Sequence, residues 1–408
     1  MNPAEAVFRE ARTRVVAALA ARLRDLDLAE DAFAEAAVAA VADWGSEPPR
    51  DGAAWLYRVG LRKAFDALRR AHVRRTTALD PPPPGPTPED LLMAAREPIP
   101  DERLKLIFVC CHPALAPEAR VALTLKVVCG LSTQRLARAF LSAEPAMLQR
   151  ITRAKRKIRE AGIAFQVPGP EAWSERLDAV LATLEIAYAQ AYEDAAGAGD
   201  AAGLAEEVLR LSGLLAEIMP REPEVLAMAA LVRFGEARRP ARLDDFGAMT
   251  PVGEQDVGLW RTDLLSQGAV LLDRAADAGR TGPYQLVAAI HAAHLSRRDT
   301  GSTPWADIVV LYDALVRLRP NAVVGVNRAV AIGEAEGAAA GLAVLEDVAG
   351  QERLQGWLPY QAARAMLCRL SDRPAEARQA LAAALALGPP PAERLYLERT
   401  LAGLDADA

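Results

Sequence analysis

The stretch LSTQRLARAFLSAEPAMLQRITRAKRKIRE, residues 131–160, predicts two helices separated by a short turn. Apolar residues at helical spacing give each helix one buried stripe. They are Leu136 and Phe140 in the first helix and Met147, Ile151 and Ile158 in the second. The second helix ends in a dense run of positive charge, residues 150–159. A helix-turn-helix has this layout, in which the apolar stripe docks the second helix and its basic face meets DNA.

Ser142 is expected to cap the second helix, and Pro145 lies in its first turn, where a missing N–H does no harm. Seven side chains are then candidates to enter or flank the major groove: Thr133, Gln134, Glu144, Met147, Gln149, Arg150 and Arg153. Four others are expected to hold phosphate, which positions a protein without specifying a sequence: Lys155, Arg156, Lys157 and Arg159. The alternative is an ordinary solvated charge run.

A second basic segment, AWLYRVGLRKAFDALRRAHVRR, spans residues 54–75. Seven Lys and Arg between Arg58 and Arg75 face a single acid, Asp66. The predicted buried stripe consists of Leu56, Val59, Phe65 and Leu68. The residues then predicted to point outward are Arg58, Arg62, Lys63, Arg69 and Arg70. An aromatic pair near the start, Trp55 and Tyr57, could stack on unpaired bases. The alternative is a basic surface helix with Trp55 in the core.

An acidic helix, LAEDAFAEAAVAAVADWG at residues 28–45, precedes this segment. Its many alanines leave a flat apolar surface suited to docking another helix, and four carboxylates lie among them: Glu30, Asp31, Glu35 and Asp43. The alternative is a plain amphipathic helix.

The whole chain of 408 residues reads as all-α, because helical periodicity recurs throughout and strong helix formers dominate. Helices are predicted at about 4–24, 28–44, 52–73, 102–111, 117–128, 132–140 and 143–161. Four consecutive prolines predict a semi-rigid linker over 77–101 between two small helical domains, 1–76 and 102–166. After the break QVPGP, helices alternate with Pro- or Gly-marked turns, which predicts a solenoid of tetratricopeptide-like hairpins over 171–408.

The sign of the net charge changes at the same break, near residue 170. Residues 1–170 sum to +6 and residues 171–408 to −12, so the overall −6 conceals a basic N-terminal part. No apolar run is long enough to span a bilayer, the N-terminus lacks the apolar core of a secretory signal, and four cysteines make no disulfide framework. A cytoplasmic protein without membrane contact is the simplest expectation.

Catalytic and metal sites are not expected. The chain carries no P-loop, GxSxG or HExxH pattern. The run Cys110, Cys111, His112 lacks a second cysteine pair, and His291 and His294 lack a third ligand nearby. We therefore expect no enzyme activity, metal or other cofactor.

Four N-terminal motifs carry a resemblance to a known family. They are AEDAFAEA at 29–36, AWLYRVGLRKAFDALRR at 54–70, EPIPDERLKLIFVCCHPALAPEARVALTLKVVCGLST at 97–133 and QRITRAKRKIREAGIAF at 149–165. Residues 1–165 resemble the extracytoplasmic-function (group IV, sigma-70 superfamily) sigma factors of bacterial RNA polymerase. With LDDFGAMTPVGEQDVGLW at 243–260 and GPYQLVAAIHAAH at 282–294, the chain resembles the subgroup with a C-terminal tetratricopeptide-like extension.

The resemblance implies a transcription initiation factor with core RNA polymerase and promoter DNA as partners. The acidic helix, with Glu30, Asp31, Glu35 and Asp43, would dock on the β′ clamp helices, and the helix-turn-helix domain would contact the β flap and read the −35 element. The first basic helix would recognise and help open the −10 element through Arg58, Arg62, Lys63, Asp66, Arg69, Arg70, Arg74 and Arg75. The acidic extension is expected to regulate activity, through an intramolecular contact with the sigma domains or through a signalling partner.

Two residues depart from the family pattern. Lys63 stands where Asn is usual, and Ala146 replaces a frequent Thr, which implies an altered promoter preference or a weaker phosphate contact. Two rival functions remain open from the residues alone. A non-enzymatic helical scaffold would not copurify with polymerase, and a stand-alone helix-turn-helix repressor or activator would bind duplex DNA tightly without it.

Overall fold

The computed structural model describes residues 3–44, 49–75, 102–140, 142–193, 204–349 and 352–406. Apart from an isolated β-bridge between Leu243 and Met249, the regular elements in these ranges are helices, which confirms the all-α prediction. The chain divides into two compact units, Met1–Ala187 and Tyr188–Ala408. The predicted linker over 77–101 lies outside the described residues.

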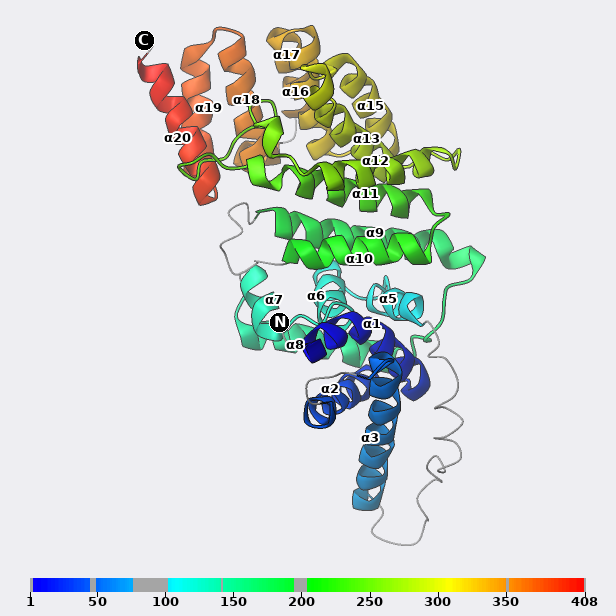
Figure 1. Cartoon of the computed structure of the whole chain (residues 1–408). Helices are drawn as coiled ribbons and strands as arrows, with labels where there is room; N and C mark the ends of the chain where they lie inside the picture. The colour runs from blue at the N-terminus through cyan, green and yellow to red at the C-terminus, as the bar shows by residue number, and fades with distance from the viewer. Residues whose placement is uncertain are drawn as a thin grey trace. The chain divides into compact units, whose positions relative to one another are not determined.

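The first part of unit 1 is a bundle of α1 (Pro3–Leu23), α2 (Leu26–Asp43) and α3 (Gly52–Arg75), which pack against one another (Figure 1). Asp25 begins α2 because its carboxylate accepts hydrogen bonds from the backbone N–H groups of Asp27 (2.9 Å) and Leu28 (3.1 Å). The buried stripe of α2 is mostly alanine, so its neighbours approach closely. Its members are Leu26, Ala29, Ala32, Phe33, Ala36 and Ala40.

The second part of unit 1 contains the helix-turn-helix segment. Its helices are α5 (Arg103–Cys110), α6 (Pro117–Val127), α7 (Thr133–Ala139) and α8 (Glu144–Glu160). Both α6 and α7 pack against α8, and α5 packs against α1. All predicted helices of this unit up to residue 161 are confirmed, with each end within two residues of its predicted position. Helical periodicity and Pro-marked starts were therefore sufficient to locate them.

The helix α9 (Pro170–Glu193) begins at the predicted break, yet most of it, up to Ala187, belongs to unit 1. The Trp173 ring lies 5.5 Å from the Phe108 ring of α5, centroid to centroid. The Arg176 guanidinium donates a hydrogen bond of 2.6 Å to the carbonyl of Phe108. The boundary between the two compact units consequently falls inside α9, after Ala187.

Unit 2 is a succession of helices that mostly pack on their neighbours in sequence, as stacked helical hairpins do. The α-helices are α10 (Leu204–Ile218), α11 (Pro223–Arg238), α12 (Thr262–Ala276), α13 (Pro283–Leu295), α14 (Arg297–Thr300), α15 (Trp305–Leu318), α16 (Ala322–Glu336), α17 (Ala338–Ala349), α18 (Leu358–Leu370), α19 (Pro374–Ala386) and α20 (Pro391–Ala406). Short 3₁₀ turns lie at η1 (Arg239–Ala241), η2 (Val257–Leu259) and η3 (Glu352–Gly356).

The crossing of α16 and α17 leads to a prediction. A Cβ built on Gly341 would lie 2.7 Å from the carbonyl oxygen of Ala329 and 2.7 Å from the Cα of Gly333. Both are backbone atoms that cannot rotate away, so Gly341→Ala is expected to lower the free energy of unfolding by about 1–3 kcal/mol. In contrast, a Cβ on Gly403 in α20 meets nothing within 4 Å, and Gly403→Ala is expected to be stabilising by about 0.5–1 kcal/mol. Thermal unfolding of both variants tests the prediction, and equal midpoints would contradict it.

Candidate nucleic-acid interface

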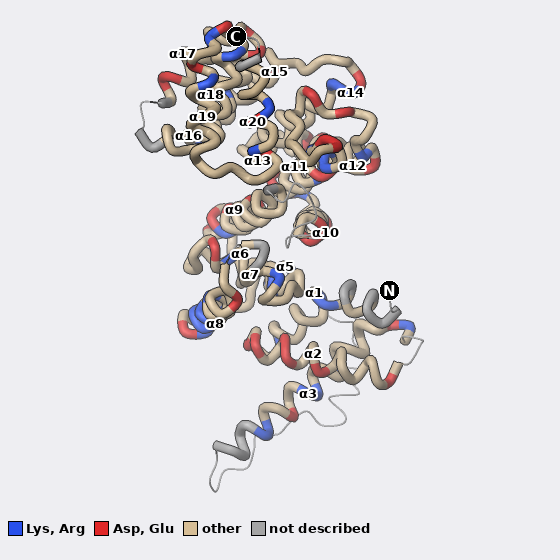
Figure 2. Tube along the Cα trace, turned by 90° about the vertical axis from the view of Figure 1, so that its left-hand side faces the viewer, with Lys and Arg blue, Asp and Glu red and all other residues tan. Residues whose placement is uncertain are grey.

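The helix α8 has one apolar stripe and one basic face. Met147, Ile151, Ala154 and Ile158 are buried at helical spacing and pack toward α6 and α7. The opposite face exposes cations, and Figure 2 shows them gathered along the helix. The exposed cations are Arg153, Arg156, Lys157 and Arg159, whereas Arg150 is half-buried.

The turn before α8 differs from its prediction in one respect. Ser142 does not cap the helix, because the N-cap position is Ala143 and no side chain makes a capping hydrogen bond there. The expected Pro145 does lie in the first turn. At the preceding helix, Ser132 accepts a hydrogen bond of 3.1 Å from the N–H of Arg135, so a serine caps α7 instead.

Several predicted groove residues are accessible. Gln134, Glu144 and Gln149 are exposed, and Thr133 is half-buried. Met147 is different, since its side chain is 0 % exposed. Its prediction as a DNA contact is therefore wrong for this conformation, and its prediction as a core residue is confirmed. The physical reason is its place on the same helical stripe as Ile151 and Ile158.

All four predicted phosphate contacts have protein partners. The Arg156 guanidinium lies 3.8 Å from the Glu160 carboxylate, and that of Arg159 lies 3.8 Å from the carboxylates of Asp25 and Asp27.

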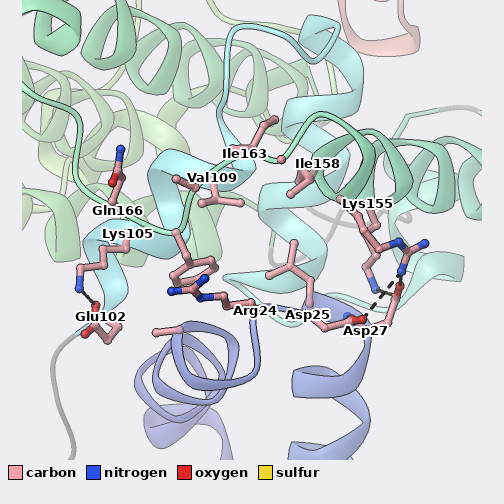
Figure 3. A pocket seen from close by; sticks show the side chains of 16 residues that line it. Arg24, Asp25, Asp27, Glu102, Lys105, Val109, Lys155, Ile158, Ile163 and Gln166 are labelled. Atoms are coloured by element: carbon pink, nitrogen blue, oxygen red, sulfur yellow. Dashed lines mark hydrogen bonds and ion pairs between the residues drawn. The ribbon is translucent and has the colours of Figure 1, made fainter. Parts of the chain in front are cut away.

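The Lys157 ammonium donates to the carbonyl of Ala114, although the side chain stays exposed. The Lys155 ammonium contacts the carboxylates of Asp27 (2.6 Å; Figure 3) and Glu30 (2.7 Å) in α2, and only 12 % of its side chain is exposed. Lys155 is therefore not available for phosphate in this conformation, contrary to its prediction.

On the other basic helix, α3, only some of the predicted DNA-binding side chains are exposed. Arg62, Arg69 and Arg70 are exposed, whereas the remaining described members of the predicted set are half-buried: Arg58, Lys63 and Asp66. The side chains of Arg74 and Arg75 lie outside the described residues.

The predicted core stripe of α3 is only partly correct. Leu56 is fully buried, but Leu68 is 46 % exposed. Trp55 is half-buried and stacks edge-on against Trp44, with ring centroids 5.3 Å apart. The contact with the buried Trp44 therefore holds Trp55 against the core of the bundle.

The acidic helix α2 exposes both carboxylates and apolar side chains. Val38 and Val41 are 73 % and 61 % exposed, although valine is usually buried. Three predicted polymerase-binding carboxylates lie on the exposed surface: Asp31, Glu35 and Asp43. Partial burial and the neighbouring Asp27 carboxylate raise the pKa of Asp31. The fourth, Glu30, is half-buried beside Lys155 and Arg12.

The dismissed metal candidates are packed in the protein. Cys110 and Cys111 are buried, and the Cys111 sulfur lies 3.3 Å from the Thr124 hydroxyl. His291 is half-buried, and its Nδ1 lies 3.2 Å from the guanidinium of Arg238. Partial burial and the nearby positive charge of Arg238 lower the pKa of both histidines, that of His294 to about 4. Among the described residues, no group of three or more His, Cys, Asp or Glu could hold a metal ion. In the same ranges, no helix has both the length and the apolar character that crossing a bilayer requires.

Comparison with known proteins gives two matches. Residues 176–276 match a family of unknown function (DUF6596). An uncharacterized protein of Rhizobium meliloti (strain 1021) is 39 % identical over 411 residues, which cover 97 % of this chain and 95 % of that protein. The chain belongs to the same family as that protein. No solved structure matches this chain. The alignment extends over both units of this chain.

Proposed function

We propose that this chain is a sigma factor, a subunit that directs bacterial RNA polymerase to specific promoters and assists strand opening. The observation that carries the proposal is the combination in unit 1 of two exposed cationic helix faces, on α3 and α8, with an acidic helix whose apolar side chains are exposed. A solvated charge run explains the first feature but not the exposed Val38 and Val41.

Each helix has a distinct part in this function. The exposed face of α2 docks on the β′ clamp helices of core polymerase through apolar contact and charge. The basic face of α3 recognises the −10 element and stabilises its opened strand, and α7 and α8 read the −35 element near the β flap. The protein performs no bond chemistry, because its work is recognition and strand separation.

The docking role of α2 leads to a prediction. Val38→Asp combined with Val41→Asp places two charges on the exposed apolar surface, and affinity for core polymerase is expected to fall at least about tenfold. The matched control is Val310→Asp with Val323→Asp in unit 2, whose valines are 65 % and 50 % exposed. Binding of both variants to labelled core polymerase is measured by fluorescence anisotropy. Equal affinity of the test variant and the control would contradict the docking role.

The C-terminal extension is proposed as a regulator, on the basis of its charge of −12 against +6 for the preceding residues. Because Trp173 and Arg176 pack on Phe108, a truncation must keep α9 intact to leave unit 1 undamaged. A chain that ends at Glu193 meets this requirement. Its promoter-dependent transcription is compared with that of the full chain, and identical output under every condition would remove the regulatory role.

A further inference from the structure

The segment LDDFGAMTPVGEQDVGLW, residues 243–260, is a C-terminal motif to which the proposed function gives no part. It connects η1 to α12 as a loop that contains the 3₁₀ turn η2, and it reaches the last helix, α20 (Figure 1). The Met249 N–H donates a hydrogen bond of 2.9 Å to the carbonyl of Ala392 in α20. The Arg399 guanidinium of α20 contacts the Asp244 carboxylate. The loop therefore joins the last helix of unit 2 to a segment 155 residues earlier in the chain.

Asp244 also fixes the shape of this loop. Its Oδ1 accepts hydrogen bonds from the backbone N–H groups of Phe246 (2.9 Å) and Ala248 (2.8 Å). Gly247 lies between those two residues with a φ of +81°, which favours glycine. The Arg399 guanidinium lies over the Phe246 ring, 5.1 Å from its centroid. The charges of Asp244 and Arg399 are consequently used within the protein, where they hold the loop in place.

A cleft of about 390 Å³ lies between this loop and the helices α18 and α20. Its lining includes Thr250 and Glu254 of the loop, Arg369 of α18, and Tyr396 and Thr400 of α20. The volume falls in the range of about 300–1,000 Å³ that is usual for small-molecule sites. Because charged and hydroxyl-bearing side chains line much of it, the cleft suits a small polar ligand.

Two opposite charges of this cleft are not neutralised within the described part of the chain. In those ranges neither the Glu254 carboxylate nor the Arg369 guanidinium has a hydrogen-bond or ion-pair partner, and both side chains are exposed. Both act on the half-buried phenol of Tyr396. Burial and Glu254 raise the pKa of Tyr396, and they outweigh Arg369 and a hydrogen bond with Thr400, which lower it. The phenol therefore keeps its proton at neutral pH and can donate a hydrogen bond beside the two free charges.

The signs of the two charges select the ligand. A ligand with only a negative charge would pair with Arg369 but be repelled by Glu254, and a ligand with only a positive charge would meet the reverse situation. We propose that the cleft binds a free α-amino acid, whose carboxylate pairs with Arg369 and whose ammonium group pairs with Glu254. Since both protein charges act on one phenol, the complementary charges of the ligand must also lie close together, as they do in an α-amino acid.

Such a ligand would contact the loop, α18 and α20 at once, and it would stabilise unit 2 because it binds the folded form. Binding requires neither polymerase nor DNA. The inference therefore goes beyond the proposed sigma-factor function and does not depend on it, and failure of one leaves the other intact. In a sigma factor, the cleft would make the C-terminal extension a sensor of amino acids.

The test uses the full chain at about pH 6.5, where an α-amino group is protonated and a carboxyl group is ionised. Each proteinogenic L-amino acid is titrated into the protein by isothermal titration calorimetry. We expect at least one to bind, and we expect Arg369→Gln and Glu254→Gln each to weaken its binding at least about tenfold. The matched controls are Arg394→Gln and Glu398→Gln, which change exposed residues of α20 outside the cleft and are expected to have no effect.

Analogues that carry one charge show which residue meets which group of the ligand. The amide of the bound amino acid lacks the carboxylate, and the corresponding carboxylic acid without its amino group lacks the ammonium. Both analogues are expected to bind the parent chain more weakly than the amino acid does. We expect Arg369→Gln to cause no further loss with the amide, and Glu254→Gln to cause no further loss with the carboxylic acid.

Two results would overturn the inference: no binding of any amino acid by the parent chain, or equal weakening of binding by the cleft variants and the controls. Both cleft residues are exposed and have no printed-over contact to lose within the described ranges, so glutamine is expected to leave the fold unchanged. Circular dichroism verifies this in all four variants.

Discussion

Replacing Met147 with alanine is expected to lower the free energy of unfolding of unit 1 by about 2–5 kcal/mol, the range for truncating a fully buried methionine. Met147 is 0 % exposed and lies in the stripe that fixes α8 against α6 and α7. Hydrogen exchange over residues 117–160 measures the change, because it reads local opening within one unit of a chain that has two.

The control is the next residue of the same helix. Leu148 is 55 % exposed, so Leu148→Ala is expected to change the opening free energy by less than about 0.5 kcal/mol. Equal loss of protection in the two variants would contradict the assignment of Met147 to the core. Unchanged protection in Met147→Ala with weakened promoter binding would instead restore its original interpretation as a DNA contact.

Replacing Arg153 and Arg156 together with alanine is expected to weaken promoter binding by the complex with core polymerase about a hundredfold at ~0.15 M salt. Both side chains lie on the exposed face of α8. Arg156 lies 3.8 Å from Glu160 in an ion pair whose two side chains are largely exposed. If each arginine holds one phosphate, the slope of log affinity against log salt concentration falls in magnitude by about 2.

Two arginines of unit 2 supply the control, since Arg298 and Arg317 are also exposed. Their replacement with alanine removes the same charge from the chain and is expected to leave both the affinity and the salt slope unchanged. An equal effect of the two double variants would mean that net charge, rather than the basic face of α8, determines binding. Circular dichroism verifies that helicity is retained in both.

The helices could be predicted from the sequence because their signals are local. The stripe of Met147, Ile151 and Ile158 repeats at helical spacing, and Pro145 marks the start of α8. The prediction that Ser142 caps α8 is wrong. The sequence shows that a polar residue lies near the helix start, but which residue becomes the N-cap depends on where the preceding turn ends. The exposure of Leu68 depends on which part of α3 its neighbouring helices cover. The periodicity of α3 alone gives no information about those neighbours.

The contact between α8 and α2 could not be predicted from any local pattern. Asp27 and Lys155 are 128 residues apart, and nothing in the spacing of either helix indicates that they meet. The sequence therefore predicts Lys155 among the exposed cations and gives no signal for Asp27. The helical start of α9 was predictable from QVPGP, whereas the packing of Trp173 on Phe108 is a tertiary contact and was missed.

The most direct test of the proposed sigma-factor function is reconstitution of the full chain with core RNA polymerase, followed by sequencing of transcript 5′ ends on genomic DNA. The account predicts a stable complex and a discrete set of start sites that share upstream elements and disappear when the chain is omitted. Failure of core polymerase to retain the chain, or identical start sites with and without it, would contradict the account.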